Sequence, residues 1–211
     1  MTGSTTRALL IFPCNGNGLE ALDCLGDAYA FAGFIDDEPG KQGSDRHGHR
    51  VMPRTALGAL PDAHVLAIPG SPLSYRRRRE AIEGLRIPEQ RFARVIHPRA
   101  SVSPLATIGH NVLLMAGVVV TSNARIGNHV CVLPNTVIHH DVVVGDWSLI
   151  GASVTIAGGT VVEENCYVGS GTSLMHGLQI GKGALVGLGS NVIRDVPAGS
   201  TVAGNPARRL R

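Results

Sequence analysis

The chain has 211 residues, of which 44% are hydrophobic, 17% charged and only 4% aromatic, with a formal net charge of +3. That length suits one large or two modest domains, and the small charge with few aromatic residues argues against a nucleic-acid surface. No apolar run approaches a membrane span, and the N-terminal run 8–12 is too short for a signal-peptide core. We therefore expect a cytoplasmic protein without a nucleic-acid or membrane partner, and with four reduced, structural cysteines.

The N-terminal segment predicts a small α/β domain. A buried strand at 8–12 is followed by a Gly/Asn-rich turn at 13–18 and by apolar residues at helical spacing from Leu19. Further strands are predicted at 31–35, 49–52 and 64–68, and a helix at 74–85. The whole unit is only about ninety residues, too short for the double βαβαβ arrangement that holds a dinucleotide.

The turn at 13–18 is a candidate nucleotide site. Gly16, Gly18 and Ala21 fit the pattern G-x-G-x-x-A, and Asp36 follows about twenty residues later. Backbone amides at such a turn can face a phosphate or ribose, and the acidic side chain can accept a hydrogen bond from a base or hydroxyl. A mononucleotide fits better than NAD, and a purely structural glycine turn is an equal alternative.

A run of four arginines, 76–79, precedes Glu80 and the apolar residues Ile82 and Leu85. This pattern predicts a helix whose arginines lie on a solvated outer face. A phosphate contact from one of them is the alternative.

From Ile96 to Val192, aliphatic residues recur at every sixth position. The column comprises Ile96, Val102, Ile108, Leu114, Val120, Ile126, Val132, Ile138, Val144, Ile150, Ile156, Val162, Val168, Leu174, Ile180, Val186 and Val192. Six is a multiple of the strand period of two, so each repeat predicts a short strand and a corner. The residues two positions earlier are mostly small or apolar and should share the interior. Such repeats predict a β-helix whose stacked coils bury one core.

No long linker precedes the repeats at Val95, so we expect the two parts to pack together. After Val192 the chain ends in a segment rich in Gly and Pro, followed by Arg208, Arg209 and Arg211. These arginines are expected to form either a solvated terminus or a phosphate-facing tail.

The clearest break in the repeats is Ile138-His139-His140-Asp141. His140 and Asp141 fall at a corner, where side chains can project outward. A histidine beside a carboxylate can act as a general base, with the acid fixing the ring orientation. A solvated or interface histidine is the alternative that the residues alone leave open.

The Gly turn, Asp36-Asp37, His97-Pro98, His140-Asp141 and the ending 203–208 together resemble one bacterial family. It is the hexapeptide-repeat sugar acyltransferases, which comprise UDP-4-amino-sugar N-acetyltransferases and sialic acid O-acetyltransferases. The resemblance implies a Rossmann-like α/β domain at 1–94 that binds a sugar nucleotide. It also implies a left-handed parallel β-helix of about five to six coils at 95–211, with acetyl-CoA as co-substrate. A homotrimer with active sites between subunits is implied as well.

The same resemblance implies roles for individual residues. His140 would be the general base and Asp141 its orienting partner. Positions for acetyl-CoA would be Gly158, whose amide meets the thioester carbonyl, Ser170 and Leu188. Positions for the sugar nucleotide would be Asn15, Gly16, Asn17, Asp36, Asp37 and Gly70.

This sequence departs from the family pattern at three places. The usual Gly-x-x-Gly-His-Gly turn has Pro13 and Asn17 in place of its first glycine and its histidine. A second histidine on the CoA side of the cleft is Leu149, and the loop 68–72 is stiffened by two prolines. These changes leave the nucleotide base open.

The resemblance favours direct transfer of an acetyl group to the amine of a nucleotide-linked 4-amino-6-deoxy sugar in glycan or polysaccharide biosynthesis. The alternatives are O-acetylation of the sialic acid kind and a non-enzymatic sugar-nucleotide-binding scaffold. A zinc enzyme is disfavoured because the histidines show no convincing ligand spacing, so we expect no metal.

Overall fold

The computed structural model describes residues 6–210. Its N-terminal part is a five-stranded sheet in the order β3-β4-β2-β1-β5, in which only β3 is antiparallel. The strands are β1 (Arg7–Phe12), β2 (Tyr29–Ile35), β3 (Gly43–Ser44), β4 (Arg50–Met52) and β5 (His64–Ala67). Because β1 lies between β2 and β5, the strand order reverses at β1, and the carboxyl ends of β1 and β5 border a crevice of the kind where α/β sheets bind ligands.

Short helices connect these strands. They are α1 (Gly16–Glu20), η1 (Ala21–Cys24), η2 (Pro39–Lys41), α2 (Ala56–Ala59), η3 (Tyr75–Arg77), α3 (Arg78–Glu83) and η4 (Glu89–Arg91). The predicted strands are confirmed to within two residues at each end, as is the helix at 74–85 in the form of η3 and α3. The two-residue strand β3 and the single-turn helix α2 were not predicted, because neither is long enough to show a period.

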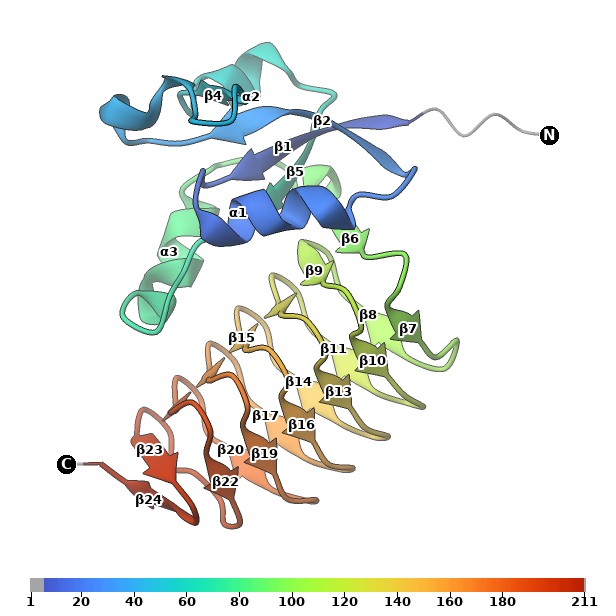
Figure 1. The fold of residues 1–211 in the computed structure, drawn as a ribbon, viewed down its shortest axis with the longest axis vertical. Helices are drawn as coiled ribbons and strands as arrows, with labels where there is room; N and C mark the ends of the chain where they lie inside the picture. Colours follow the sequence, from blue (N-terminus) through green and yellow to red (C-terminus); the bar gives the residue numbers. More distant parts are fainter. Residues whose placement is uncertain (1–5, 211) are drawn as a thin grey trace.

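The remainder is a parallel β-helix with three faces (Figure 1). The six-stranded face contains β7 (Ser101–Val102), β10 (Val119–Val120), β13 (Val137–Ile138), β16 (Thr155–Ile156), β19 (Ser173–Leu174) and β22 (Asn191–Val192). The five-stranded face contains β8 (Thr107–Ile108), β11 (Arg125–Ile126), β14 (Val143–Val144), β17 (Val161–Val162) and β20 (Gln179–Ile180). The eight-stranded face contains β6 (Arg94–Ile96), β9 (Val112–Leu114), β12 (Cys131–Val132), β15 (Leu149–Ile150), β18 (Tyr167–Val168), β21 (Leu185–Val186), β23 (Thr201–Gly204) and β24 (Ala207–Arg209).

Neighbouring strands on a face pair in register 18 residues apart, so one coil consists of three hexads. Residues 18 apart therefore stack in columns at the three corners. We name the corners by one member each: the His140 corner (122, 140, 158, 176), the His129 corner (111, 129, 147, 165, 183) and the Ser170 corner (134, 152, 170, 188). The six-stranded face separates the His140 corner from the Ser170 corner.

The interior is the predicted one. The hexad column is buried from Leu114 onward, and its first three members are partly buried against the same core. Polar residues in the second column bond to backbone within the core: the Thr136 hydroxyl donates to the Gly151 carbonyl at 2.7 Å and accepts from the Val154 N–H at 3.1 Å. The repeats therefore tolerate threonine and serine inside without leaving hydroxyls unpaired.

The two parts pack directly against each other, as predicted. Leu113, Cys131 and Leu149 point outward from the eight-stranded face and share a cluster with residues of β1, α1 and β5. Figure 1 shows the N-terminal sheet and its helices seated at the first coils of the β-helix. The Asn111 amide pairs with both backbone groups of Ala67, at 2.7 and 2.8 Å, on the free edge of β5. The interface therefore has both apolar and directional contacts.

The expectation that all four arginines of 76–79 face solvent is wrong for Arg78. Its side chain is only 1% exposed and donates to the carbonyls of Pro69, Trp147 (3.1 Å) and His129 (2.6 Å). Burial lowers its pKa to about 10. The helix buries this arginine because α3 lies against the β-helix, which a sequence pattern on α3 alone does not reveal.

At the C-terminus, β23 and β24 form an antiparallel hairpin that joins the eight-stranded face. None of the helices within residues 6–210 has the length and apolar character needed to cross a membrane. The four cysteines are unpaired, and three of them are buried.

Candidate active site

His140 and Asp141 lie in the turn between β13 and β14, on the outside of the His140 corner. The His140 Nδ1–H donates to Asp141 Oδ2 at 2.8 Å, and the two side chains are 65% and 55% exposed. Because Nδ1 carries the proton, Nε2 is left as the acceptor nitrogen. The corner thus presents an accessible, oriented imidazole base.

The carboxylate of Asp141 is fixed from two sides. Asp141 has a φ of 60°, a left-handed conformation that aspartate tolerates, and Asn123 one coil earlier donates to its other oxygen at 3.1 Å. The hydrogen bonds from His140 and then from Asn123 lower the pKa of Asp141. The acid is therefore ionised wherever His140 is a neutral base.

Gly158 lies one coil after His140, in the same column. A Cβ built on Gly158 would lie 2.5 Å from Cε1 and Nε2 of the His140 ring, so only glycine leaves room for the imidazole in this position. The Gly158 N–H donates no hydrogen bond within residues 6–210. The predicted base and the predicted oxyanion amide are thus brought together, and the reason is the 18-residue stacking.

Ser170 and Leu188 are not brought to His140. They stack at the Ser170 corner, across the six-stranded face, where the Ser170 hydroxyl accepts from the Ala152 N–H at 3.0 Å. Leu188 is 81% exposed. One chain therefore separates the predicted base from these two predicted CoA positions.

In the N-terminal domain, the structure assigns different surroundings to the predicted turn residues. Asn15 caps α1 by accepting from the Gly18 N–H at 2.8 Å. Gly16 is exposed, and a Cβ built on it would meet no atom within 4 Å. Asp36 is only 4% exposed, and its oxygens accept from the N–H groups of Cys14 and Glu38, each at 3.0 Å. Asp36 thus ties the turn after β1 to the end of β2.

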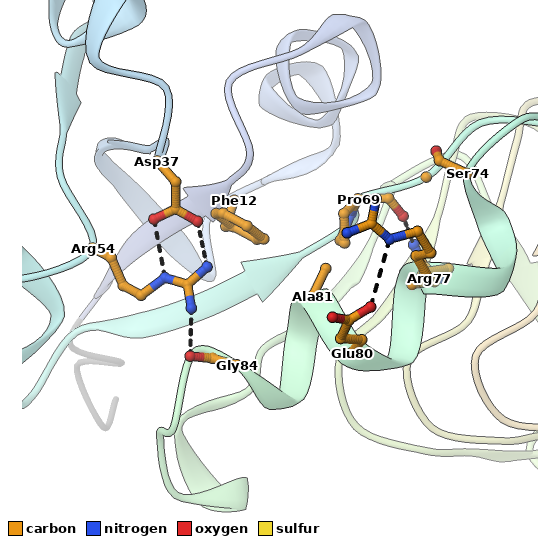
Figure 2. Close-up of a pocket in the computed structure, with 11 residues that line it drawn as sticks. Phe12, Asp37, Arg54, Pro69, Ser74, Arg77, Glu80, Ala81 and Gly84 are labelled. Carbon is orange, nitrogen blue, oxygen red and sulfur yellow. Dashed lines mark hydrogen bonds and ion pairs between the residues drawn. The ribbon is translucent and has the colours of Figure 1, made fainter.

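Asp37 and Gly70 line a pocket of about 500 Å³ at the carboxyl ends of β1 and β5. On one wall Arg54 holds the Asp37 carboxylate with Nε and Nη2 and donates from Nη1 to the Gly84 carbonyl (Figure 2). On the opposite wall Arg77 pairs with Glu80 at 3.5 Å. We call this hollow the Arg54 pocket; its apolar lining comes from Phe12, Pro69 and Ala81.

A second hollow, of about 180 Å³, lies between the domains. It is lined by Asn17 and the loop 70–72 of the N-terminal domain, and by Leu149 and Tyr167 of the eight-stranded face. Its lining continues to Gly151, beside the Ser170 corner. Because Gly70 lines both hollows, its loop is the boundary between the Arg54 pocket and this interdomain hollow.

Sequence reasoning missed the contacts of Arg54 and Arg78, two of the arginines that line the Arg54 pocket. Arg54 follows β4 in a stretch without a motif, and its pairing with Asp37 spans 17 residues of chain. No local sequence pattern predicts the contacts of Arg54 or of Arg78. Among residues 6–210, no group of three or more His, Cys, Asp or Glu side chains could hold a metal ion.

Two models of six-residue repeats match the sequence. The model "bacterial transferase hexapeptide (six repeats)" matches residues 105–139 and 123–158, and the model "hexapeptide repeat of succinyl-transferase" matches residues 141–176. A comparison with curated protein sequences gives no match.

Solved structures that resemble the whole chain include acetyltransferases. The acetyltransferase domain of PglB from Neisseria gonorrhoeae FA1090, in complex with acetyl coenzyme A, is 28% identical, with a TM-score of 0.84 over 97% of this chain and 100% of that one. PerB from Caulobacter crescentus, in complex with CoA and GDP-perosamine, is 26% identical, with a TM-score of 0.83 over 98% of each chain. WeeI from Acinetobacter baumannii AYE is 27% identical, with a TM-score of 0.82 over 98% and 100%.

The repeat models cover the coils that carry His140 and Gly158, and the structural similarity extends over both domains. The chain therefore carries the hexapeptide repeats of bacterial transferases within residues 105–176, and its whole length resembles acetyltransferases of known structure.

Proposed function

We propose that the protein is an acetyl-CoA-dependent N-acetyltransferase acting on the amino group of a nucleotide-linked 4-amino-6-deoxy sugar, in bacterial glycan or polysaccharide biosynthesis. The observation that carries the proposal is the exposed His140–Asp141 pair held over Gly158. The complexes of PglB with acetyl coenzyme A and of PerB with CoA and GDP-perosamine support the two substrates. Its place of action is the cytoplasm, where acetyl-CoA is available.

The chemistry is a direct transfer. The sugar amine attacks the thioester carbonyl while Nε2 of His140 takes a proton from the amine, and the free amide of Gly158 stabilises the developing oxyanion. The C–S bond then breaks, and the departing CoA thiolate takes the proton back from the imidazolium. Asp141 stabilises that imidazolium, and no covalent acetyl-enzyme is formed.

We assign residues 1–94 to a Rossmann-like sugar-nucleotide domain and residues 95–211 to a left-handed acyltransferase β-helix. Asn15, Gly16 and Asn17 would lie along the nucleotide, and Asp37 and Gly70 at its base and sugar sides. Asp36 would act by fixing the turn, since its oxygens are already bonded within the protein.

Acetyl-CoA would lie between two subunits of a homotrimer. Ser170 and Leu188 are one face of the β-helix away from His140 within one chain. A trimer can place the Ser170 corner of one subunit beside the His140 corner of the next, so that Gly158, Ser170 and Leu188 all line one CoA path.

The proposal is tested by release of free CoA thiol from acetyl-CoA with a panel of acceptors: UDP-, dTDP- and GDP-linked 4-amino-6-deoxy sugars, and free sialic acid. We expect turnover with an amino-sugar nucleotide. Turnover with sialic acid alone would replace the proposal by O-acetylation, and no turnover with any acceptor would favour a binding scaffold.

A further inference from the structure

One wall of the Arg54 pocket is an ion pair between Arg54 and Asp37. Arg54 donates hydrogen bonds from Nε–H and one Nη2–H to the Asp37 carboxylate, and from one Nη1–H to the Gly84 carbonyl. A guanidinium has five N–H donors, so one on Nη1 and one on Nη2 have no partner assigned by these contacts. Arg54 is 37% exposed, so these donors are accessible from the pocket side.

Asp37 complements these donors. An ionised carboxylate has about four lone-pair sites, of which Arg54 occupies two, and the side chain is 47% exposed. The wall therefore presents two donors directly beside acceptor sites, and the ion pair holds them in a fixed order. A ligand edge that fits this wall must offer two neighbouring acceptors followed by donors.

The remaining lining suits the faces of a flat ring. Phe12 and Pro69 are buried and Ala81 is half-buried, and the Arg54 guanidinium lies 5.7 Å from the centroid of the Phe12 ring. A volume of about 500 Å³ is within the range of small-molecule sites and admits a two-ring base. Gly70 connects this pocket to the interdomain hollow, where the proposed sugar would lie.

Among nucleobases, guanine and cytosine have the matching edge, and guanine is the two-ring base of the pair. Its N7 and O6 are neighbouring acceptors that arginine binds with two parallel hydrogen bonds, and its N1–H and N2–H donors come next. Adenine interrupts its acceptors with an amino group, and uracil and thymine offer a single acceptor on each side of one donor. Cytosine offers O2 and N3 beside its amino group, but its single ring would fill less of a pocket of about 500 Å³ and cover less of the apolar lining than the two rings of guanine.

We infer that the Arg54 pocket binds the base of the sugar nucleotide and selects guanine, with Arg54 as a specificity-determining residue and Asp37 as its partner. The inference rests on the proposed function for the presence of a sugar nucleotide. Base selection is separate from the acetyl-transfer chemistry at His140, so the two can be tested apart.

The test is calorimetric titration of the protein, without acetyl-CoA, with GDP, CDP, UDP, dTDP and ADP. We expect GDP to bind about 10-fold to 100-fold more tightly than UDP, dTDP and ADP, as one bidentate arginine–guanine contact provides, and more tightly than CDP because guanine has a second ring. Arg54→Met should abolish the preference over UDP, dTDP and ADP and leave weak binding of all five. Arg54→Lys should also lose most of it, because an ammonium group cannot form the fork.

Arg79→Met is the matched control. Arg79 is an arginine on α3 that pairs with Glu83 at 2.8 Å but does not line the Arg54 pocket, so the GDP preference should remain in this variant. If Arg54→Met does not fold, as thermal unfolding would reveal, Arg54→Lys decides the outcome.

Three results would overturn the inference: binding of another diphosphate as tight as that of GDP, an unchanged preference in both Arg54 variants, or no binding of any nucleotide. The acceptor panel reports on acetyl transfer independently. GDP binding without acetyl transfer would contradict only the proposed function. Acetyl transfer with a UDP-linked sugar alone would contradict only the selection of guanine.

Discussion

The β-helix presents histidine in two contrasting settings, at the His140 corner and at the His129 corner. His140 is exposed and bonded to a carboxylate. His129 is 6% exposed, stacked on Trp147 with ring centroids 3.9 Å apart, and its Nδ1 accepts from the Asn111 amide at 3.0 Å. Burial, followed by the nearby charges of His110 and Arg78, lowers the pKa of His129 to about 3.

His129 occupies the left-handed position of its corner turn, with a φ of 59°, whereas at the other corner Asp141 occupies that position and His140 comes one residue before it. This one-residue offset does not decide which histidine is covered. The N-terminal domain does. It covers the His129 corner with α3 and leaves the His140 corner open. The same residue type is therefore structural where the domain docks and available for chemistry where it does not.

The largest expected effect is a loss of acetyl-transfer activity when His140, at the open corner, is replaced. His140→Ala should lower the acetyl-transfer rate by about a hundred- to ten-thousand-fold, the usual contribution of a general base, with little change in the free energy of unfolding. Steady-state thiol release measures the rate. His176→Ala, in the same column two coils away, is the control and should keep near-normal activity; an active His140→Ala would remove the catalytic assignment.

At the covered corner, Arg78→Met should lower the free energy of unfolding by about 3 kcal/mol. The change leaves three carbonyl groups without a donor inside the domain interface. Urea titration measures the loss. Arg79→Met, which removes an exposed ion pair and a cation–π contact with Trp147, should change stability by less than about 1 kcal/mol. Equal effects of the two changes would mean that the interface does not depend on Arg78.

The depressed pKa of His129 predicts a pH dependence of stability. His129 binds a proton near pH 6.5 when unfolded but only near pH 3 when folded, so the unfolded state gains protons as the pH falls and stability decreases through that window. Between pH 7 and pH 5 this should remove about 2 kcal/mol.

Urea titrations at both pH values compare the wild type with His129→Gln, which cannot be protonated there. The variant should be less stable at pH 7 but lose less on acidification. A variant with the same pH dependence as the wild type would show that His129 is not the titrating group.

The smallest effect is expected for Asp141→Asn. The amide has one acceptor oxygen for the two donors, Asn123 and the ring, and it gives up the charge that stabilises the imidazolium. Because the ring itself survives, the rate should fall by no more than about a hundredfold, the lower end of a general base's contribution. The pH profile of the rate separates this from misfolding, since removing the charge beside the base should change the shape of the profile, whereas misfolding should only lower it. An unaltered profile would argue that Asp141 does not orient the base.

The same contrast explains what the sequence can predict. The hexad column from Leu114 to Val192 and the stacking of Gly158 on His140 follow from a fixed local period. The β-helix, its core and the position of Gly158 beside His140 can therefore be predicted from the sequence. Burial of Arg78 and the pairing of Arg54 with Asp37 depend on how α3 and β4 meet distant segments. No period encodes such contacts, and so the pocket walls emerged only with the structure.

The segment formed by η3 and α3 has a consequence for cooperativity. Stacked coils contact only their neighbours, so a β-helix alone can fray coil by coil from either end. Arg78 bonds to the His129 carbonyl, while Tyr75 and Arg76 bond to the carbonyls of Gly183 and Gly199, three and four coils further along. One short helical segment thus binds both early and late coils. We therefore expect the amide hydrogens of all these coils to exchange at similar rates, rather than at rates that rise towards the ends of the β-helix.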